Sequence, residues 1–226
     1  MESSRNKIII LGGGIVGLTI AYRLIERNIS SKIIILEKEK EIGLHTSGRN
    51  SGVLHSGIYY RPNTIKAKVC SQGSKRMRNW IEKRKLSLKD CGKVIVPSNL
   101  EEDKMLDTLY ERGVKNGCEV ELWNESKLTK FMPEAYSASG RALWSPKTCV
   151  VNPKEVLNQL EKELISMGVE IIKDAKIQRV NLVQNSIETT NNLSLYFDYV
   201  FNATGLQSDR VSKLFNIDHP YKLLPF

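Results

Sequence analysis

Two short apolar runs with a glycine turn between them constrain the fold of this chain more than any other feature. Residues 7–11 and 32–36 both read KIIIL, as expected of strands that are buried on both faces of a parallel sheet. Glycines at 12–14 end the first run, and residues 18–25 then carry apolar side chains at helical spacing. Strand, glycine turn, helix and strand in this order predict a right-handed βαβ unit.

The glycines have the spacing Gly12-x-Gly14-x-x-Gly17, which is typical of dinucleotide-binding folds. The first permits a tight turn, the second lets backbone N–H groups approach a pyrophosphate, and the third lets helix and strand pack closely. Glu37 ends the second strand, where a carboxylate accepts a hydrogen bond from a ribose 2′-OH and disfavours the 2′-phosphate of NADP. The alternative without a ligand is a glycine-rich turn beside a surface glutamate.

The first half of the remaining chain gives mixed signals. Residues 41–61 predict an ordered loop, and residues 65–81 a helix with one apolar face. Ser98 and Glu101 form a capping-box pattern for a helix that ends near residue 115. Short strands are expected at 93–96 and 119–122, whereas residues 131–151 are turn-rich with little helix or strand signal.

Regular patterns return from Asn152 onward. Asn152-Pro153 is a strong helix start, and Gly168 ends that helix. The last strand, residues 199–202, has the apolar character of a parallel sheet, so a second domain is predicted to be inserted between parts of the first. Further short strands are expected at 169–172, 177–183, 186–189 and 193–197, and a short helix at 206–215.

Composition sets the class of protein. With 226 residues, 41% hydrophobic and 26% charged, the chain is an ordinary globular protein and not a collagen-like or disordered one. Its four cysteines form no CxxC pair, which disfavours a zinc site or a disulfide framework and predicts no metal. Eight of the basic residues that give the net charge of +9 lie at 66–85 with one acid, as on a solvated helix face or a surface that contacts anionic lipid. No pattern typical of nucleic-acid binding accompanies them.

The loop SGRNSGVLHSGIYYRP, residues 47–62, contains more glycines and hydrogen-bond donors than a generic loop needs. This stretch and the motif FNATG at 201–205 resemble the FAD-dependent amino-acid and hydroxy-acid oxidoreductases of the D-amino-acid-oxidase type, and the loop is most similar to L-2-hydroxyglutarate oxidases and dehydrogenases. The resemblance implies a doubly wound, Rossmann-like FAD-binding α/β domain with part of an antiparallel α+β substrate domain. An NAD-dependent dehydrogenase would fit Gly12 to Glu37 but leaves both other motifs unexplained.

The resemblance also implies roles for individual residues. Gly12, Gly14, Gly17 and Glu37 would hold the ADP half of FAD, and the backbone of Ile177 would meet the adenine. Thr204 and Gly205 would approach the cofactor from the other side. The residues that would line the pyrophosphate and flavin are Ser47, Arg49, Asn50, Ser51, Gly52 and Val53.

His55 is the candidate catalytic residue. Oxidation of a 2-hydroxy acid moves a hydride from the carbinol carbon to flavin N5 while a base takes the hydroxyl proton, and an imidazole has a suitable pKa. Alternatives for His55 are a residue that orients the flavin or one bonded to it covalently. Candidates for binding a dicarboxylate are Tyr59, Tyr60, Arg61 and Lys66, and Tyr60 and Arg61 are the two assigned to the substrate. Each could equally be rim packing or a surface cation, and this alternative is favoured for Lys66.

The expected function is oxidation of L-2-hydroxyglutarate to 2-oxoglutarate. Other substrates of the family, namely an amino acid, an N-methyl amino acid or glycerol 3-phosphate, remain alternatives. The expected domains are a first part of the FAD-binding domain at 1–90, a partial substrate domain at 91–150 and a return to the FAD-binding domain at 151–226. Members of the family are nearly twice as long, which suggests an N-terminal part or a non-catalytic dinucleotide-binding fragment. A cytoplasmic location is expected, with peripheral contact to the inner membrane face or its quinone as a hypothesis.

Overall fold

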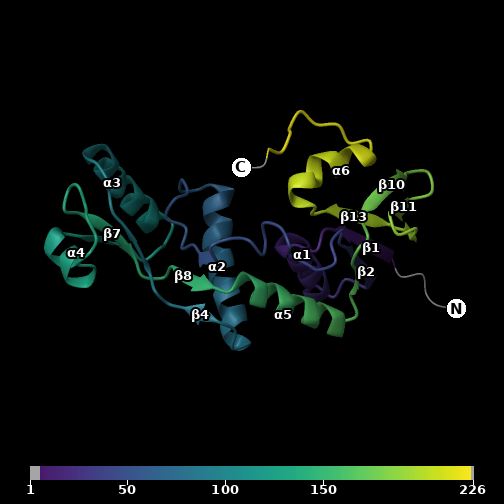
Figure 1. Cartoon of the computed structure of the whole chain (residues 1–226), viewed down its shortest axis with the longest axis horizontal. Coiled ribbons are helices and arrows are strands. Elements are labelled where there is room, and N and C mark those ends of the chain that lie inside the picture. Colours follow the sequence, from purple (N-terminus) through teal and green to yellow (C-terminus); the bar gives the residue numbers. More distant parts are fainter. Residues whose placement is uncertain (1–5, 225–226) are drawn as a thin grey trace. The chain divides into compact units, whose positions relative to one another are not determined.

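The computed structural model describes residues 6–224, and the chain in it divides into two compact units. Residues 6–50 and 153–224 form the first unit, and residues 51–152 form the second (Figure 1). The second unit is therefore an insertion in the sequence of the first. The boundary between the units follows Asn50, whereas the first predicted part of the FAD-binding domain extends to residue 90. The roles assigned to the predicted domains stay a prediction.

A four-stranded parallel sheet forms the centre of the first unit. Its strand order is β13-β1-β2-β9, and every neighbouring pair is parallel. Both KIIIL runs are strands, as predicted, and the strand predicted at 199–202 lies beside the first of them. The bounds are β1 Asn6–Leu11, β2 Ser31–Leu36, β9 Glu170–Ile172 and β13 Tyr199–Asn202.

Successive isoleucines of β1 face opposite sides of this sheet because strand side chains alternate. Ile9 and Leu11 pack with Ala175, Ile187 and Val211 in one apolar cluster on one face. On the other face lies the helix α1 (Ile15–Glu26), which packs against α5 (Pro153–Ser166). The sheet is thus covered on both sides, which explains why both runs are apolar throughout.

The remaining elements of the first unit form the layer on the Ile9 face. A three-stranded antiparallel sheet has the order β10-β11-β12, and it packs with the short helix α6 (Figure 1). Their bounds are β10 Ile177–Asn181, β11 Ser186–Thr189, β12 Ser194–Tyr196, the 3-10 helix η1 Gly205–Gln207 and α6 Ser208–Leu214.

Two three-stranded antiparallel sheets belong to the second unit. One has the order β3-β8-β4 and the other the order β5-β7-β6. The strands are β3 Val53–Leu54, β4 Leu88–Lys89, β5 Lys93–Ile95, β6 Glu121–Trp123, β7 Ala142–Ser145 and β8 Cys149–Val151. The helices are α2 Ile65–Lys83, α3 Leu100–Lys115 and α4 Glu125–Phe131.

Sequence interpretation missed the two strands that lie at the centres of these sheets. Strands β7 and β8 fall in the stretch 131–151, for which little regular structure was expected. They are only four and three residues long, so no periodicity can develop within them. Their neighbours in the sheets come from distant parts of the chain, and this tertiary pairing stabilises them.

Two local predictions in the second unit are corrected. The side chain that caps α3 is Asn99 and not Ser98, because the Asn99 carboxamide oxygen accepts hydrogen bonds from the N–H groups of Glu101 and Glu102. The expected apolar face of α2 is only partly buried: Ile81 is inaccessible, while Ile65 and Val69 are 83% and 61% exposed. Among the helices described, none is both long enough and apolar enough to cross a bilayer.

Candidate functional site

The glycine turn of the first unit lies where the carboxyl ends of β1 and β13 meet. The N–H of Gly12 donates to the carbonyl of Leu36, and the N–H of Ala203 donates to the carbonyl of Leu11. Gly12 has a φ of +107°, and a Cβ placed on it would lie 2.5 Å from the Ala203 carbonyl oxygen. Since the chain connects β1 to β2 on one side and β13 pairs on the other, this is the switch point at which open α/β sheets bind ligands.

Helix α1 begins directly after this turn. Gly14 is the N-cap, and the N–H of Ile15 donates to the Ser47 hydroxyl at 3.0 Å. A Cβ on Gly14 would lie 2.9 Å from that same hydroxyl oxygen. No acidic residue occupies the first turn, so the positive end of the helix dipole is not neutralised by a side chain within that turn. This arrangement suits an anion such as a pyrophosphate.

The third glycine closes the contact between helix and strand. A Cβ on Gly17 would lie 2.0 Å from the Gly12 carbonyl oxygen and 3.3 Å from Cγ2 of Ile10. Only a glycine allows α1 to approach β1 this closely. The three glycines of the spacing motif therefore lie together, as the sequence predicted, each against backbone or a packed side chain.

Glu37 lies beside the glycine turn at the end of β2, with only 8% of its surface exposed. Its Oε2 accepts the N–H of Gly13 at 2.7 Å, and its Oε1 accepts the N–H of Glu39 at 2.9 Å. Each carboxylate oxygen has a second lone pair, so the group retains capacity to accept a hydrogen bond from a ligand hydroxyl. The strand that begins at Ile177 is held nearby, because the N–H of Ala175 donates to the Glu37 carbonyl.

The loop that follows Glu37 is folded by its own polar side chains. The carboxamide of Asn50 donates to the carbonyls of Thr46 and Ser47. Arg49 is exposed and forms no ion pair among residues 6–224, so its guanidinium is available to an anion. His45, to which the sequence assigned no role, pairs with Glu39 at 2.8 Å; hydrogen bonds from Lys38 and His45 lower the pKa of Glu39 to about 2.

The motif at 201–205 forms the turn after β13. The Thr204 hydroxyl donates to the Asn202 carboxamide oxygen at 2.6 Å, and the Asn202 amide donates to the Ser208 carbonyl. Gly205 has a φ of +56°, and a Cβ added to it would meet no atom within 4 Å, so this glycine serves the turn and not a close contact. Asn202, not among the predicted site residues, organises the turn.

Three further predicted residues begin the second unit. Ser51 is exposed, and the carbonyl of the buried Gly52 accepts the N–H of Val151 at 2.9 Å. Gly52 has a φ of +67°, which explains a glycine there. Val53 pairs with Val150 in the β3-β8 ladder. This pairing fixes the start of the segment that carries His55.

His55 lies in a cluster with Tyr59 and Lys93. The His55 and Tyr59 rings meet edge to face with centroids 6.1 Å apart, and the Lys93 ammonium lies 4.7 Å from the centre of the Tyr59 ring. Partial loss of solvent around the imidazole lowers the pKa of His55 below its usual 6.5, and the positive charge of Lys93 lowers it further. The imidazole is therefore neutral near pH 7 and has a free lone pair to accept a proton.

A buried hydroxyl network fixes the residue after His55. The Ser56 hydroxyl lies 2.9 Å from the Ser145 hydroxyl, which lies 3.1 Å from that of Thr148. Ser145 is inaccessible to solvent and Thr148 is 3% exposed. The thiol of Cys118 also donates to the Ser56 carbonyl at 3.0 Å. Sequence interpretation missed this network because Ser145 and Thr148 lie in the stretch where no strands were expected.

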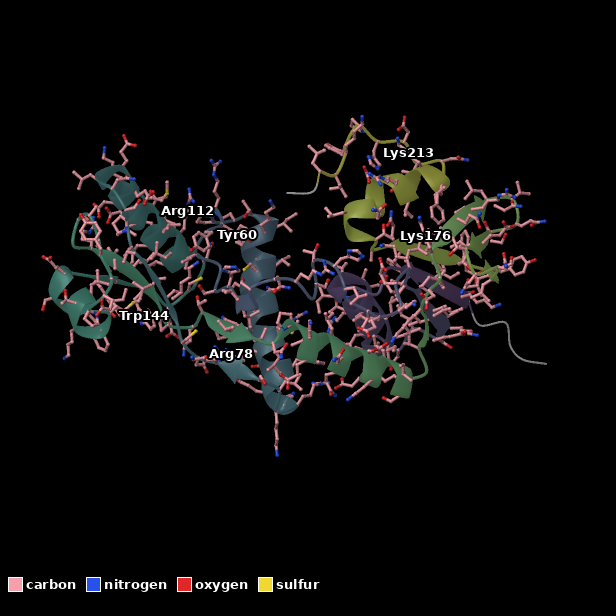
Figure 2. The ribbon with its side chains drawn as sticks, viewed as in Figure 1. Tyr60, Arg78, Arg112, Trp144, Lys176 and Lys213 are labelled. Carbon is pink, nitrogen blue, oxygen red and sulfur yellow. The ribbon has the colours of Figure 1, made fainter. Side chains whose placement is uncertain are left out.

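The predicted substrate residues follow in the same loop. The Tyr60 carbonyl accepts the Asn116 carboxamide at 2.9 Å, and Arg112 on α3 donates to the Tyr59 carbonyl; Figure 2 labels Tyr60 and Arg112. Arg61 is exposed, and its side chain forms no ion pair among the described residues. The structure therefore anchors the backbone of this loop to α3 and leaves the Arg61 guanidinium in solvent.

The first unit fits the ADP half of a dinucleotide. Gly12, Gly14 and Gly17, which we call the glycine cradle, come together with the start of α1 and the Glu37 carboxylate at the carboxyl edge of the sheet. The dinucleotide-binding fingerprint requires this arrangement. Of the predicted residues, Gly12, Gly14, Gly17, Glu37 and Ser47 are joined by the contacts given above. Their binding role itself stays a prediction.

Comparison with known proteins identifies relatives by sequence. The model of the family "FAD dependent oxidoreductase" (DAO) matches residues 7–226. Proteins named mitochondrial L-2-hydroxyglutarate dehydrogenase from Bos taurus and L-2-hydroxyglutarate dehydrogenase from Indibacter alkaliphilus are each 34% identical and align with 100% and 97% of this chain. The chain spans about half the length of these curated relatives, 51% and 55% respectively.

Solved structures share the fold. The L-α-glycerophosphate oxidase of Mycoplasma pneumoniae, solved with FAD bound, has a TM-score of 0.81 at 23% identity over 92% of this chain and 56% of its own. The glycine oxidase of Geobacillus kaustophilus has a TM-score of 0.84 at 19% identity over 96% of this chain and 60% of its own. The predicted fold class, with FAD as the cofactor of the family, is confirmed. This chain belongs to the DAO family of FAD-dependent oxidoreductases.

Proposed function

We propose that this chain carries the dinucleotide-binding part and the base of an enzyme that oxidises L-2-hydroxyglutarate to 2-oxoglutarate with FAD. The observation that carries the proposal is the 34% identity, along the whole chain, to proteins named L-2-hydroxyglutarate dehydrogenase. The loop at 47–62, which carries His55, is the stretch on which the substrate assignment depends.

The ADP half of FAD is assigned to the first unit. Gly12, Gly14 and Gly17 would allow the pyrophosphate to reach the start of α1, and Glu37 would accept a ribose hydroxyl. Ser47 would act at the same helix start, where its hydroxyl meets the Ile15 N–H. Further proposed contacts to the pyrophosphate and flavin are Arg49, Asn50, Ser51, Gly52, Val53, Thr204 and Gly205, with the Ile177 backbone at the adenine.

His55 is proposed as the general base. The bound FAD would accept the hydride that leaves the carbinol carbon of the substrate. The neutral His55 imidazole would take the hydroxyl proton on its unprotonated nitrogen, and the ring would then be an imidazolium. The lowered pKa of His55 supports this role because it keeps the base unprotonated at neutral pH. Tyr60 and Arg61 are proposed to contact the substrate, with the exposed guanidinium matching a carboxylate.

Peripheral contact with the inner, cytoplasmic face of a membrane, or with its quinone, is proposed through α2. Lys66, Lys68, Lys75, Arg76 and Lys83 are exposed on this helix, and the apolar side chains of Ile65 and Val69 are exposed at its start. Arg78, which Figure 2 labels, is excluded from this surface because it is half-buried and paired with Asp90 and Glu82. Co-sedimentation with anionic but not neutral vesicles at low salt is expected. No binding to either kind of vesicle, or equal binding to both, would refute the contact.

Absorption spectroscopy and a substrate panel test the function. The protein would be purified alone and co-expressed with the second half of a relative, and spectra recorded before and after acid precipitation. Flavin bands are expected, and colour retained in the pellet would indicate a covalent link with His55 as the candidate site. The preparation that holds FAD would then be assayed by dye reduction with L- and D-2-hydroxyglutarate, glycine, an N-methyl amino acid and glycerol 3-phosphate. Formation of 2-oxoglutarate would be measured for the two hydroxyglutarates.

Each outcome of this assay distinguishes one alternative. Turnover of the L enantiomer alone supports the proposal. Faster turnover of glycine, an N-methyl amino acid or glycerol 3-phosphate would instead favour another substrate of the family. A folded protein that binds FAD or its ADP part but oxidises none of these acids in either preparation would favour the non-catalytic fragment.

A further inference from the structure

We propose that Lys93 is a specificity-determining residue of this enzyme, whose ammonium group binds a carboxylate of the substrate beside His55. The inference rests on the proposed function, because that function places His55 at the reacting hydroxyl. Neither the glycine motif nor the loop at 47–62 contains this residue. It lies more than 30 positions further along the chain, at the first position of β5.

Sheet register places Lys93 beside the His55 loop. Lys93 lies opposite Ser145 in the β5-β7 ladder, and the Ser145 hydroxyl is 2.9 Å from that of Ser56, the residue after His55. The alternation of side chains along β5 also places Lys93 on the face of the strand that is directed toward the His55 loop. Val94 packs against the Trp123 cluster, whereas Ile95, on the Lys93 side of the strand, packs in the cluster that contains Ile58.

The charge of Lys93 has no acidic partner among the described residues. Its side chain is half-buried, and its ammonium lies over the face of the Tyr59 ring, 4.7 Å from the ring centre. Two other half-buried cations of the same unit are paired with acids: Arg78 with Asp90, and Arg141 with Asp103. A half-buried ammonium that lies over an aromatic ring can still form a charge-assisted hydrogen bond with a carboxylate.

The chemistry beside Lys93 favours an organic acid over an inorganic anion. A neutral imidazole, a phenol ring and an ammonium lie together, with one acceptor for a hydroxyl proton and one cation for a carboxylate. Desolvation lowers the pKa of His55 and the Lys93 charge lowers it further, so Lys93 would both bind the acid and help to keep the base neutral. Arg61 and Lys66 are both exposed, whereas Lys93 is half-buried.

Binding of glutarate tests this assignment without oxidation. Glutarate has both carboxylates but no hydroxyl to oxidise, so its affinity is independent of turnover. The FAD-loaded protein would be titrated with glutarate while the His55 ring signals are followed by NMR, in wild type, Lys93→Met and Lys93→Arg. Lys104→Met is the matched control, since Lys104 is an exposed lysine on α3 of the same unit.

In wild type, glutarate is expected to shift the His55 signals. Lys93→Met should raise the Kd for glutarate by about tenfold or more, the loss expected for a charge-assisted hydrogen bond, and Lys93→Arg should restore most of the affinity. The Lys104→Met protein should match wild type. Unchanged affinity in a folded Lys93→Met protein, or no response of His55 in wild type, would overturn the proposal; Lys93→Gln replaces the methionine variant if that one fails to fold.

Kinetics separate this inference from the proposed function. If the enzyme oxidises L-2-hydroxyglutarate, the Lys93→Met substitution should raise KM more than it lowers kcat. An unchanged KM would reject the role of Lys93 and leave the proposed function standing. If wild type binds glutarate through Lys93 but does not oxidise L-2-hydroxyglutarate, the proposed function fails while the carboxylate site stands.

Discussion

Glu37 accepts a hydrogen bond from the backbone N–H of Gly13, with 2.7 Å between the carboxylate oxygen and the nitrogen. This bond ties the end of β2 to the turn after β1, at the edge where a dinucleotide is proposed to bind. A second bond, from the N–H of Glu39, uses the other carboxylate oxygen. The residue that the fingerprint assigns to the ribose therefore also organises the glycine turn.

Replacing this carboxylate should weaken both the fold and the cofactor site. Glu37→Gln leaves only one oxygen for two backbone donors, and the loss of one buried bond should cost about 1–3 kcal/mol of unfolding free energy. FAD affinity should fall as well. Denaturant unfolding and FAD titration measure the two effects. Glu41→Gln changes an exposed glutamate of the same loop and should change neither; equal behaviour of the two variants would contradict the assigned role.

Glycine substitutions should separate the cradle from an ordinary helix position. Gly12→Ala places a Cβ 2.5 Å from the Ala203 carbonyl oxygen at a φ of +107°, so the turn must distort and FAD binding should be lost. Gly73→Ala is the control, because this glycine lies inside α2 with no atom within 4 Å of the added carbon. It should stabilise the protein by about 0.5–1 kcal/mol. Thermal unfolding with and without FAD measures both, and retained binding in Gly12→Ala would refute the cradle.

The first unit was predictable from sequence because its signals are local. The KIIIL runs, the glycine spacing and the Asn152-Pro153 helix start each depend on neighbours within a few residues. These patterns placed Glu37 at the end of the second strand, where the structure has it, and its bond to Gly13 came from the structure. The return of the chain to the same sheet at residues 199–202 was also predicted, from apolar character alone.

The second unit was less predictable because its order depends on distant pairing. Strand β7 has four residues, and its partners are β5 and β6, which lie earlier in the chain. Without β7 there is no register to place Lys93 opposite Ser145, and therefore no reason to connect Lys93 with His55. A lysine at the start of a short strand reads as a surface residue until the sheet is known.

The pH dependence of the reaction should follow His55. Desolvation of the ring and the charge of Lys93 place the pKa of His55 below 6.5, so the base is active above that pKa and is lost as pH falls through it. The acidic limb of kcat/KM should therefore have its midpoint below 6.5. Lys93→Met should move that midpoint upward, because a repelling charge is removed. A midpoint above 6.5 in wild type would contradict the assignment.

Removal of the imidazole gives a complementary measurement. His55→Asn should lower kcat by roughly 10²–10⁴-fold, as is typical when a general base is lost, and should abolish the acidic limb. Retained FAD absorbance would show that the variant still holds the cofactor. A variant with nearly full activity would reject the base and leave the orienting role for His55.

The buried hydroxyl of Ser145 should matter for the position of His55. Ser145→Ala removes the group that lies between the hydroxyls of Ser56 and Thr148, and should cost about 1–3 kcal/mol because buried polar groups lose a partner. Since Ser56 follows His55 in the chain, the His55 ring signals in NMR spectra should shift as well. Ser74→Ala is the control, because Ser74 is a half-buried serine of α2, and this substitution should leave the His55 signals unchanged. Loss of stability with unchanged His55 signals would show that the network supports the sheet and does not position the histidine.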